Sequence, residues 1–180
     1  MPVAGYSTRF TRADLELLPE DWRAELHEGE LVMVPAPDPY HQHVALALYE
    51  RLARALGAEE RYRVLVAPVD VVVDDETVLQ PDLLVLPAGA SRPTLPWRIP
   101  HPLWVAEVLS PKSAKRDRGI KHRLYARAGV REAWLVDPDS RTIEVCDLVA
   151  GGREKFEGCG DAGSRALPGL RVEVAELFPG

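Results

Sequence analysis

The sequence predicts an α/β fold in which a central mixed β-sheet is flanked by α-helices. Short apolar runs recur along the chain, amphipathic segments lie between them, and residues 103–137 have the pattern of one strand-helix-strand unit. The chain has 180 residues, of which 46% are hydrophobic, so it can bury a core of its own. We therefore expect a single domain over residues 1–180.

The first third of the chain predicts two helices separated by a hairpin. A capped helix begins at Thr11 and ends at Pro19. The segment AELHEGELVMV (24–34) alternates around a Glu-Gly pair, which is typical of a β-hairpin. Asp38 is suited to cap the next helix, which we expect over 39–56 because apolar residues recur there at helical spacing.

The rest of the chain predicts strands and one further helix. Apolar runs predict strands at 62–74 (two, interrupted near Pro68), 81–89, 103–109, 131–139 and 141–148. A helix is expected over 114–128, stopping at Gly129. Residues 91–102 contain many prolines and predict an exposed loop, residues 151–163 are loop-rich, and 170–178 predict a strand and a turn.

Composition excludes several classes of protein. The formal net charge is -6, so the whole molecule has no long-range attraction to nucleic acid. Cys146 and Cys159 lie neither in a CxxC pair nor at zinc-ligand spacing from a histidine, so a disulfide framework and a structural zinc are not expected. No segment resembles a signal peptide or a membrane span, so we expect a cytoplasmic protein without a membrane partner. The lack of Asn, with only two Gln, hints at a thermophilic source.

The segment PLWVAEVLSP (102–111) contains the least expected residue. Six of the seven residues from Leu103 to Leu109 are apolar, which is typical of a strand buried on both faces, yet the seventh is Glu107. Side chains alternate along a strand, so Glu107 shares a face with Val105 and Leu109. A buried carboxylate is costly unless it is paired, protonated or bound to a metal. Glu107 therefore needs a partner.

Asp82 is one candidate partner, because it opens another apolar strand directly after Pro81. Taken alone, an acid in this position is typical of a turn or a cap. Two acids at the ends of adjacent strands can, however, converge on one Mg²⁺ or Mn²⁺ ion, since these cations prefer oxygen ligands and retained waters.

Lys121 is the second candidate partner. It precedes Leu124 and Tyr125 by three and four residues, so it shares the helix face that we expect to pack on the sheet. Alternatively, Lys121 pairs with Asp117, or its stem reaches out to water. Together with the two acids, an inward lysine suits metal-assisted phosphodiester hydrolysis, in which the acids hold the ion and the ammonium offsets developing charge.

A basic segment adjoins this predicted site. Eight Lys or Arg residues occur between Lys112 and Arg131 against one acid, Asp117, which gives a local charge of 8 - 1 = +7. Such a run is either a solvated helix face or a surface that contacts phosphates. The candidates for nucleic-acid binding are Lys112, Lys115, Arg116 and Arg118.

The dipeptide PD (81–82) and the segment EVLSPKS (107–113) resemble the PD-(D/E)XK, or restriction-endonuclease-like, nuclease superfamily. More closely, the chain resembles its Uma-type branch of bacterial proteins, over AELHEGELV (24–32), PDLLVL (81–86), 105–138 and LPGLRVEVAELF (167–178). The resemblance implies a restriction-endonuclease-like fold, with Asp82 and Glu107 as metal ligands. Leu109 stands where the superfamily usually has its lysine, and the resemblance implies that Lys121 replaces it.

Glu25, Glu30 and His41 also match this branch and are candidate accessory residues. His41 lies three residues before the apolar Val44, so it points inward and can orient a carboxylate or approach a phosphate; alternatively it is a core or capping histidine. Glu25 and Glu30 flank a turn, where they are either exposed hairpin charges or outer carboxylates of the site.

Two functions from different classes follow. The first is a Mg²⁺- or Mn²⁺-dependent endonuclease acting on DNA, with catalytic residues Asp82, Glu107 and Lys121 and, by analogy with enzymes that cut two strands, a homodimer. The second is a catalytically inactive nucleic-acid-binding or assembly module on the same fold. A nucleotide-binding enzyme is disfavoured, because the sequence has neither a G-x-G-x-x-G nor a Walker motif.

Overall fold

The computed structural model describes residues 9–19, 21–57, 61–87, 98–99 and 101–178. A central sheet is built from six strands: β3 (Tyr62–Val66), β6 (Leu83–Pro87), β8 (Trp104–Val108), β9 (Glu132–Asp137), β10 (Thr142–Asp147) and β11 (Arg153–Glu157). Their order is β11-β10-β9-β8-β6-β3. The central pair β8 and β9 is parallel and the other neighbours are antiparallel, which makes the sheet mixed, as predicted.

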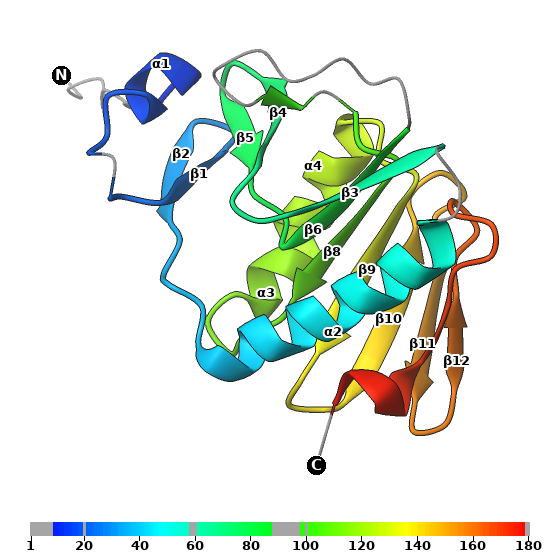
Figure 1. Ribbon diagram of the computed structural model, residues 1–180. Coiled ribbons are helices and arrows are strands. Elements are labelled where there is room, and N and C mark those ends of the chain that lie inside the picture. Colours follow the sequence, from blue (N-terminus) through cyan, green and yellow to red (C-terminus); the bar gives the residue numbers. More distant parts are fainter. Residues whose placement is uncertain (1–8, 20, 58–60, 88–97, 100, 179–180) are drawn as a thin grey trace, which may run out of the picture.

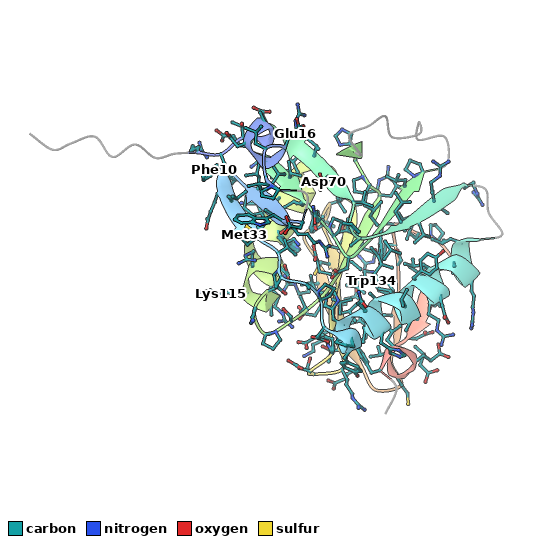
Figure 2. The ribbon with its side chains drawn as sticks, turned by 60° about the vertical axis from the view of Figure 1, so that its left-hand side comes forward. Phe10, Glu16, Met33, Asp70, Lys115 and Trp134 are labelled. Atoms are coloured by element: carbon teal, nitrogen blue, oxygen red, sulfur yellow. The ribbon has the colours of Figure 1, made fainter. Side chains whose placement is uncertain are left out.

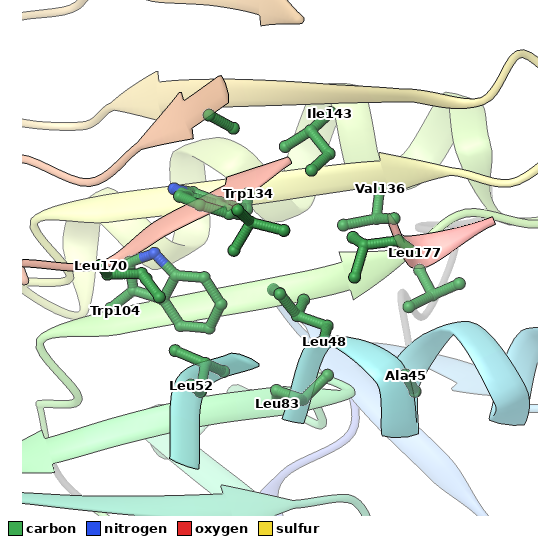
Figure 3. Close-up of a cluster of buried hydrophobic side chains, with 14 of the residues drawn as sticks. Ala45, Leu48, Leu52, Leu83, Trp104, Trp134, Val136, Ile143, Leu170 and Leu177 are labelled. Carbon is green, nitrogen blue, oxygen red and sulfur yellow. The ribbon is translucent and has the colours of Figure 1, made fainter. Parts of the chain in front are cut away.

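Helices cover both faces of this sheet (Figure 1). α2 (Pro39–Leu56) packs on one face and begins as predicted, since Asp38 accepts hydrogen bonds from the backbone N–H groups of Tyr40 and His41. Its apolar side chains pack on a core in which the Trp104 and Trp134 rings meet edge to face at 5.4 Å (Figure 3). Within the described part of the chain, no helix has the length and apolar character needed to cross a membrane.

The opposite face is covered by a helix that changes its winding. α3 (Ala114–Arg116) passes into a π-helical turn (Asp117–Lys121) and then into α4 (His122–Arg127). The prediction of one continuous α-helix over 114–128 was therefore wrong in its centre. The apolar spacing of α4 remains helical, so sequence periodicity does not reveal the wider turn, a feature that is frequent at functional sites.

A second sheet, which the sequence did not predict, lies beside the first. Its strands are β1 (Ala24–His27), β2 (Glu30–Met33), β4 (Asp70–Asp74), β5 (Thr77–Leu79) and β7 (Arg98–Ile99), in the order β2-β1-β5-β4-β7. The predicted hairpin over 24–34 is confirmed as β1 and β2. The two strands predicted over 62–74 are also confirmed, but β3 belongs to the central sheet and β4 to the second.

Some predicted loops contain strands, and one predicted helix is shorter. Residues 151–163 form β11 and β12 (Asp161–Gly163), and β12 pairs with β13 (Arg171–Glu173), which leads into a 3₁₀ turn (Val174–Leu177). β11 is a largely exposed edge strand of charged residues, so it has no apolar pattern to detect. Of the predicted loop over 91–102, the pair 98–99 is strand β7, while 91–97 and 100 lie outside the described residues. The first helix, α1, spans only Arg12–Leu15.

Candidate active site

A cavity of about 600 Å³ opens where the two sheets meet. Its polar walls come from β1, the start of α2, the start of β6, the end of β8, and the segment after β8 up to the π-helical turn. The polar and charged lining residues are Arg23, Glu25, Asp38, His41, Gln42, Gln80, Asp82, Glu107, Ser110, Lys112, Ser113, Arg116, Asp117 and Lys121. The structure therefore brings Asp82, Glu107 and Lys121 together with Glu25 and His41 around one cavity.

Asp82 and Glu107 come from adjacent antiparallel strands. Leu83 of β6 pairs with Ala106 of β8, and continuing that register by one pair places Asp82 opposite Glu107. Residues opposite each other in an antiparallel pair have Cβ atoms about 5 Å apart. The backbone N–H of Val108 donates to Asp82 Oδ2 at 2.8 Å, which holds the first carboxylate beside the second.

Glu107 is buried, and its two side-chain partners explain how a carboxylate is accommodated on this apolar strand. Its Oε1 atom lies 2.6 Å from Lys121 Nζ and accepts a hydrogen bond from the Tyr125 hydroxyl. Burial raises the pKa of Glu107 well above its usual value, and the attraction of Lys121 does not cancel the effects of burial and of the nearby acids Asp117, Asp82 and Glu25. This carboxyl group therefore favours an additional cation beside it.

Lys121 is the centre of an ion cluster. Its Nζ atom lies 3.0 Å from Glu25 Oε1, 2.6 Å from Glu107 Oε1 and 3.7 Å from Asp117 Oδ1. Burial acts to lower the pKa of Lys121, but the three carboxylates outweigh it and raise the pKa well above its usual value. The side chain is only 5% exposed, so the prediction that it points inward is confirmed and the alternative that it reaches water is wrong. Lys121 is thus a buried cation shared by three acidic side chains.

Glu25 connects the second sheet to this cluster. Its Oε1 atom accepts the backbone N–H of Gln80 at 2.7 Å, and its Oε2 atom lies 2.9 Å from His27 Nε2. Burial opposes its charge, yet Lys121, His27 and the N–H of Gln80 lower its pKa to about 2. Both oxygens have partners, so Glu25 positions Lys121. Sequence reasoning missed His27 and Gln80, because nothing local marks them.

Asp82 is the more accessible acid, with 20% of its side chain exposed. His41 Nε2 lies 3.2 Å from Asp82 Oδ2, so His41 orients a carboxylate, one of the two roles that its position predicted. Burial acts to lower the pKa of His41, but the hydrogen bond and charge of Asp82 outweigh it and raise the pKa. His41 Nδ1 is buried without a hydrogen-bond partner among the described residues.

Of the remaining predicted site residues, three lie outside the cavity and two line it. Glu30 is exposed on β2 and does not line the cavity, so of its two predicted places the structure has the exposed hairpin charge and not the outer carboxylate. Arg118 donates to Asp137 at 2.8 Å and to Glu144 at 2.9 Å, which neutralises it away from the cavity. Lys115 is exposed at the edge of the molecule, far from the buried Trp134 in Figure 2, and is not a lining residue. Lys112 and Arg116 do line the cavity.

The donor set fits a hard divalent cation that keeps several waters. Among the residues that the structure describes, no three His, Cys, Asp or Glu side chains form a complete ligand cage. Mg²⁺ is commonly held by one or two carboxylates with water in the remaining positions. Asp82 and Glu107 are placed so that they could supply such a pair, and neither Asp82 Oδ1 nor Glu107 Oε2 has a hydrogen bond or ion pair to another described residue.

Comparisons with known proteins identify the family and the fold. The sequence matches the model of the Uma2 family, described as "Putative restriction endonuclease", over residues 12–175. A search of the curated proteins finds no match. The fold is similar to the crystal structure of "a putative nuclease belonging to DUF820" from Anabaena variabilis ATCC 29413, with a TM-score of 0.76 and 20% identity, covering 92% of this chain and 94% of that chain. The predicted fold is confirmed, and the chain belongs to the Uma2 family.

Proposed function

We propose that the protein is a Mg²⁺- or Mn²⁺-dependent nuclease that hydrolyses phosphodiester bonds of DNA. The observation that carries this proposal is the pairing of Asp82 with Glu107 across adjacent strands, beside the buried Lys121 ammonium and inside one cavity. Membership of the Uma2 family supports the nuclease class.

Each side chain of the site has a separate task. Asp82 and Glu107 would hold the ion, which when bound supplies charge to the phosphate oxygens and a water of lowered pKa. Lys121, kept ionised by its three carboxylates, offsets negative charge that develops on the phosphate. His41 and the N–H of Val108 fix the orientation of Asp82.

A second candidate is an inactive module that binds nucleic acid or assembles on the same fold. Leu109, at the position of the superfamily's usual lysine, is buried and apolar. Lys121 is also fully engaged by carboxylates. Both observations favour loss of cleavage, so activity itself has to be measured.

The test combines metal binding and cleavage in the same samples. Mn²⁺ and Mg²⁺ are titrated by calorimetry into the wild type, Asp82→Asn and Glu107→Gln, and supercoiled plasmid is incubated with each protein. We expect cleavage to fall at least about 100-fold in both variants, together with loss of ion binding. Asp139→Asn, an exposed acid outside the cavity, is the matched control.

A wild type that binds no ion and leaves plasmid intact would contradict the nuclease and support the binding module. Sedimentation of the same preparation tests the proposed homodimer, which predicts twice the mass of the chain.

A further inference from the structure

The catalytic carboxylates are recessed rather than displayed on a surface. The Glu107 side chain is 5% exposed and the Asp82 side chain 20%. A duplex presents its phosphates on the outside of a wide convex rod, where they are suited to an exposed groove or face. The cavity, at about 600 Å³, has the size of a pocket that encloses one small molecule.

One wall of this cavity is apolar although it adjoins a cluster of ions. It is formed by Val34 and Pro35 after β2, by Leu46 on α2, by Val66 at the end of β3 and by Pro68 between β3 and β4. Leu46 is 55% exposed and Val66 is 36% exposed. A sugar-phosphate backbone has no flat apolar part to place there, whereas a nucleobase has one on each face.

Three cations line the cavity without carboxylate partners among the described residues. Arg23 approaches from the chain that enters β1, and Lys112 and Arg116 approach from the segment after β8. Arg123 and Arg127, further along the same basic run, are already paired with Glu28.

Of these three cations, Arg23 carries the clearest sign of a missing ligand. Its Nε atom is buried and has no hydrogen-bond partner among the described residues. A buried donor without a partner is costly, and a guanidinium matches phosphate oxygens with two parallel hydrogen bonds.

We propose that the cavity takes one unpaired nucleotide of a single strand or a flap. Its base lies against the apolar wall, and its phosphates lie between Arg23 on one side and Arg116 and Lys112 on the other. This inference rests on the proposed nuclease function and specifies its substrate. Arg23, which no sequence pattern indicated, is then a substrate-binding residue.

Binding is measured first, by fluorescence anisotropy in EDTA so that metal-dependent cleavage is prevented. The probes are a labelled single-stranded DNA, the same strand in a blunt duplex, the same strand as a flap, and a single-stranded RNA of that sequence. Either single strand and the flap are expected to bind about ten-fold more tightly than the blunt duplex, because a duplex must first be unpaired.

Two pairs of variants locate the contacts. Arg23→Ala is expected to weaken single-strand binding about ten-fold and to reduce the slope of log K against log salt by about 0.7, the value for one lost phosphate contact. Its control is Arg54→Ala, an exposed arginine paired with Glu50 on α2 and outside the cavity. Leu46→Asn is expected to weaken binding, whereas Val149→Asn, at an exposed site outside the cavity, leaves it unchanged.

Equal affinity for duplex and single strand, or an unchanged salt slope in Arg23→Ala, would overturn the proposal. Cleavage of the same probes with Mn²⁺ separates the two conclusions. If duplex is cut as fast as single strand and flap, the nuclease function stands and this inference fails. If single strands bind preferentially through Arg23 but nothing is cut, the inference about binding stands and the proposed hydrolysis fails.

Discussion

Two buried glutamates lie on neighbouring parallel strands at opposite ends of the pair. Glu107 is the penultimate residue of β8, and Glu132 is the first residue of β9. The register pairs Trp104 with Glu132 and Glu107 with Leu135, so the two carboxylates are offset along the strands and point to opposite faces of the sheet. Glu107 is 4% exposed and Glu132 is 1% exposed. By burial alone, the two are equivalent.

Their partners differ in kind. The Glu132 carboxylate accepts hydrogen bonds from the Trp134 indole at 2.7 Å and from the backbone N–H groups of Arg165 and Ala166 at 2.8 and 3.3 Å. These donors carry no charge, and Glu132 does not line the cavity. Glu107 instead faces a cation and a cavity. A buried carboxylate therefore indicates a functional site only when its partners and its access to ligand do so.

The largest effect is expected from removing Lys121, the cation that contacts Glu107 and has no counterpart at Glu132 among the described residues. Lys121→Met leaves Glu25 and Glu107 buried without their counter-charge, so the free energy of unfolding should fall by about 3–5 kcal/mol. Urea unfolding measures this loss. The exposed Lys115→Met, with an expected change below about 0.5 kcal/mol, is the control. A Lys121→Met protein as stable as the wild type would show that the cluster is not held by charge.

Exchanging glutamate for glutamine at each end should separate catalysis from stability. Glu107→Gln should reduce plasmid cleavage at least about 100-fold. It should lower the free energy of unfolding by less than Lys121→Met does, because Lys121 keeps its ion pairs with Glu25 and Asp117. Glu132→Gln should cost about 1–3 kcal/mol, because its amide cannot accept all the hydrogen bonds of the carboxylate, and the folded protein should retain cleavage. Loss of cleavage in both variants without unfolding would remove the distinction between the two ends.

The ion cluster around Glu107 should also make the stability of the protein depend on acid pH, because Glu25 pairs with Lys121. Because the pKa of Glu25 is lowered to about 2 from an ordinary value of 4.5, its stabilising contribution is complete above pH 4.5 and is lost as the pH falls towards 2. Unfolding by urea at a series of pH values should therefore show a shallower decline over this window in Glu25→Gln than in the wild type. Glu173→Gln, at an exposed position, should follow the wild type. Equal slopes in all three proteins would contradict the ion pair.

The smallest effect is expected from removing the hydrogen bond that Glu107 accepts from the Tyr125 hydroxyl. Tyr125→Phe removes this hydrogen bond and keeps the ring, so we expect a loss of about 1 kcal/mol in stability and less than about ten-fold in cleavage. Burial raises the pKa of Tyr125 well above its usual value, so the hydroxyl remains a donor throughout the working pH range. Tyr49→Phe, partly exposed on α2, is the control. A cleavage loss as large as that of Glu107→Gln would assign Tyr125 a direct part in the reaction.

Local patterns predicted much of the site. Alternation along 103–109 placed Glu107 on a buried face, and helical spacing placed Lys121 inward; both are confirmed. Arg118 belonged to the same basic run and was expected to contact nucleic acid. Its actual partners, Asp137 and Glu144, lie on β9 and β10, and no pattern near Arg118 indicates them.

The sequence by itself determined the α/β class, the family, and which faces of the main strands and helices are buried, because these depend on short-range periodicity and contiguous motifs. Only the tertiary structure decided that the 24–34 hairpin joins a second sheet and delivers Glu25 to Lys121, and that Arg23 lines the same cavity. The physical reason is that periodicity identifies a buried face but not the segment that covers it. Pairing between distant segments depends on how all the buried surfaces pack at once.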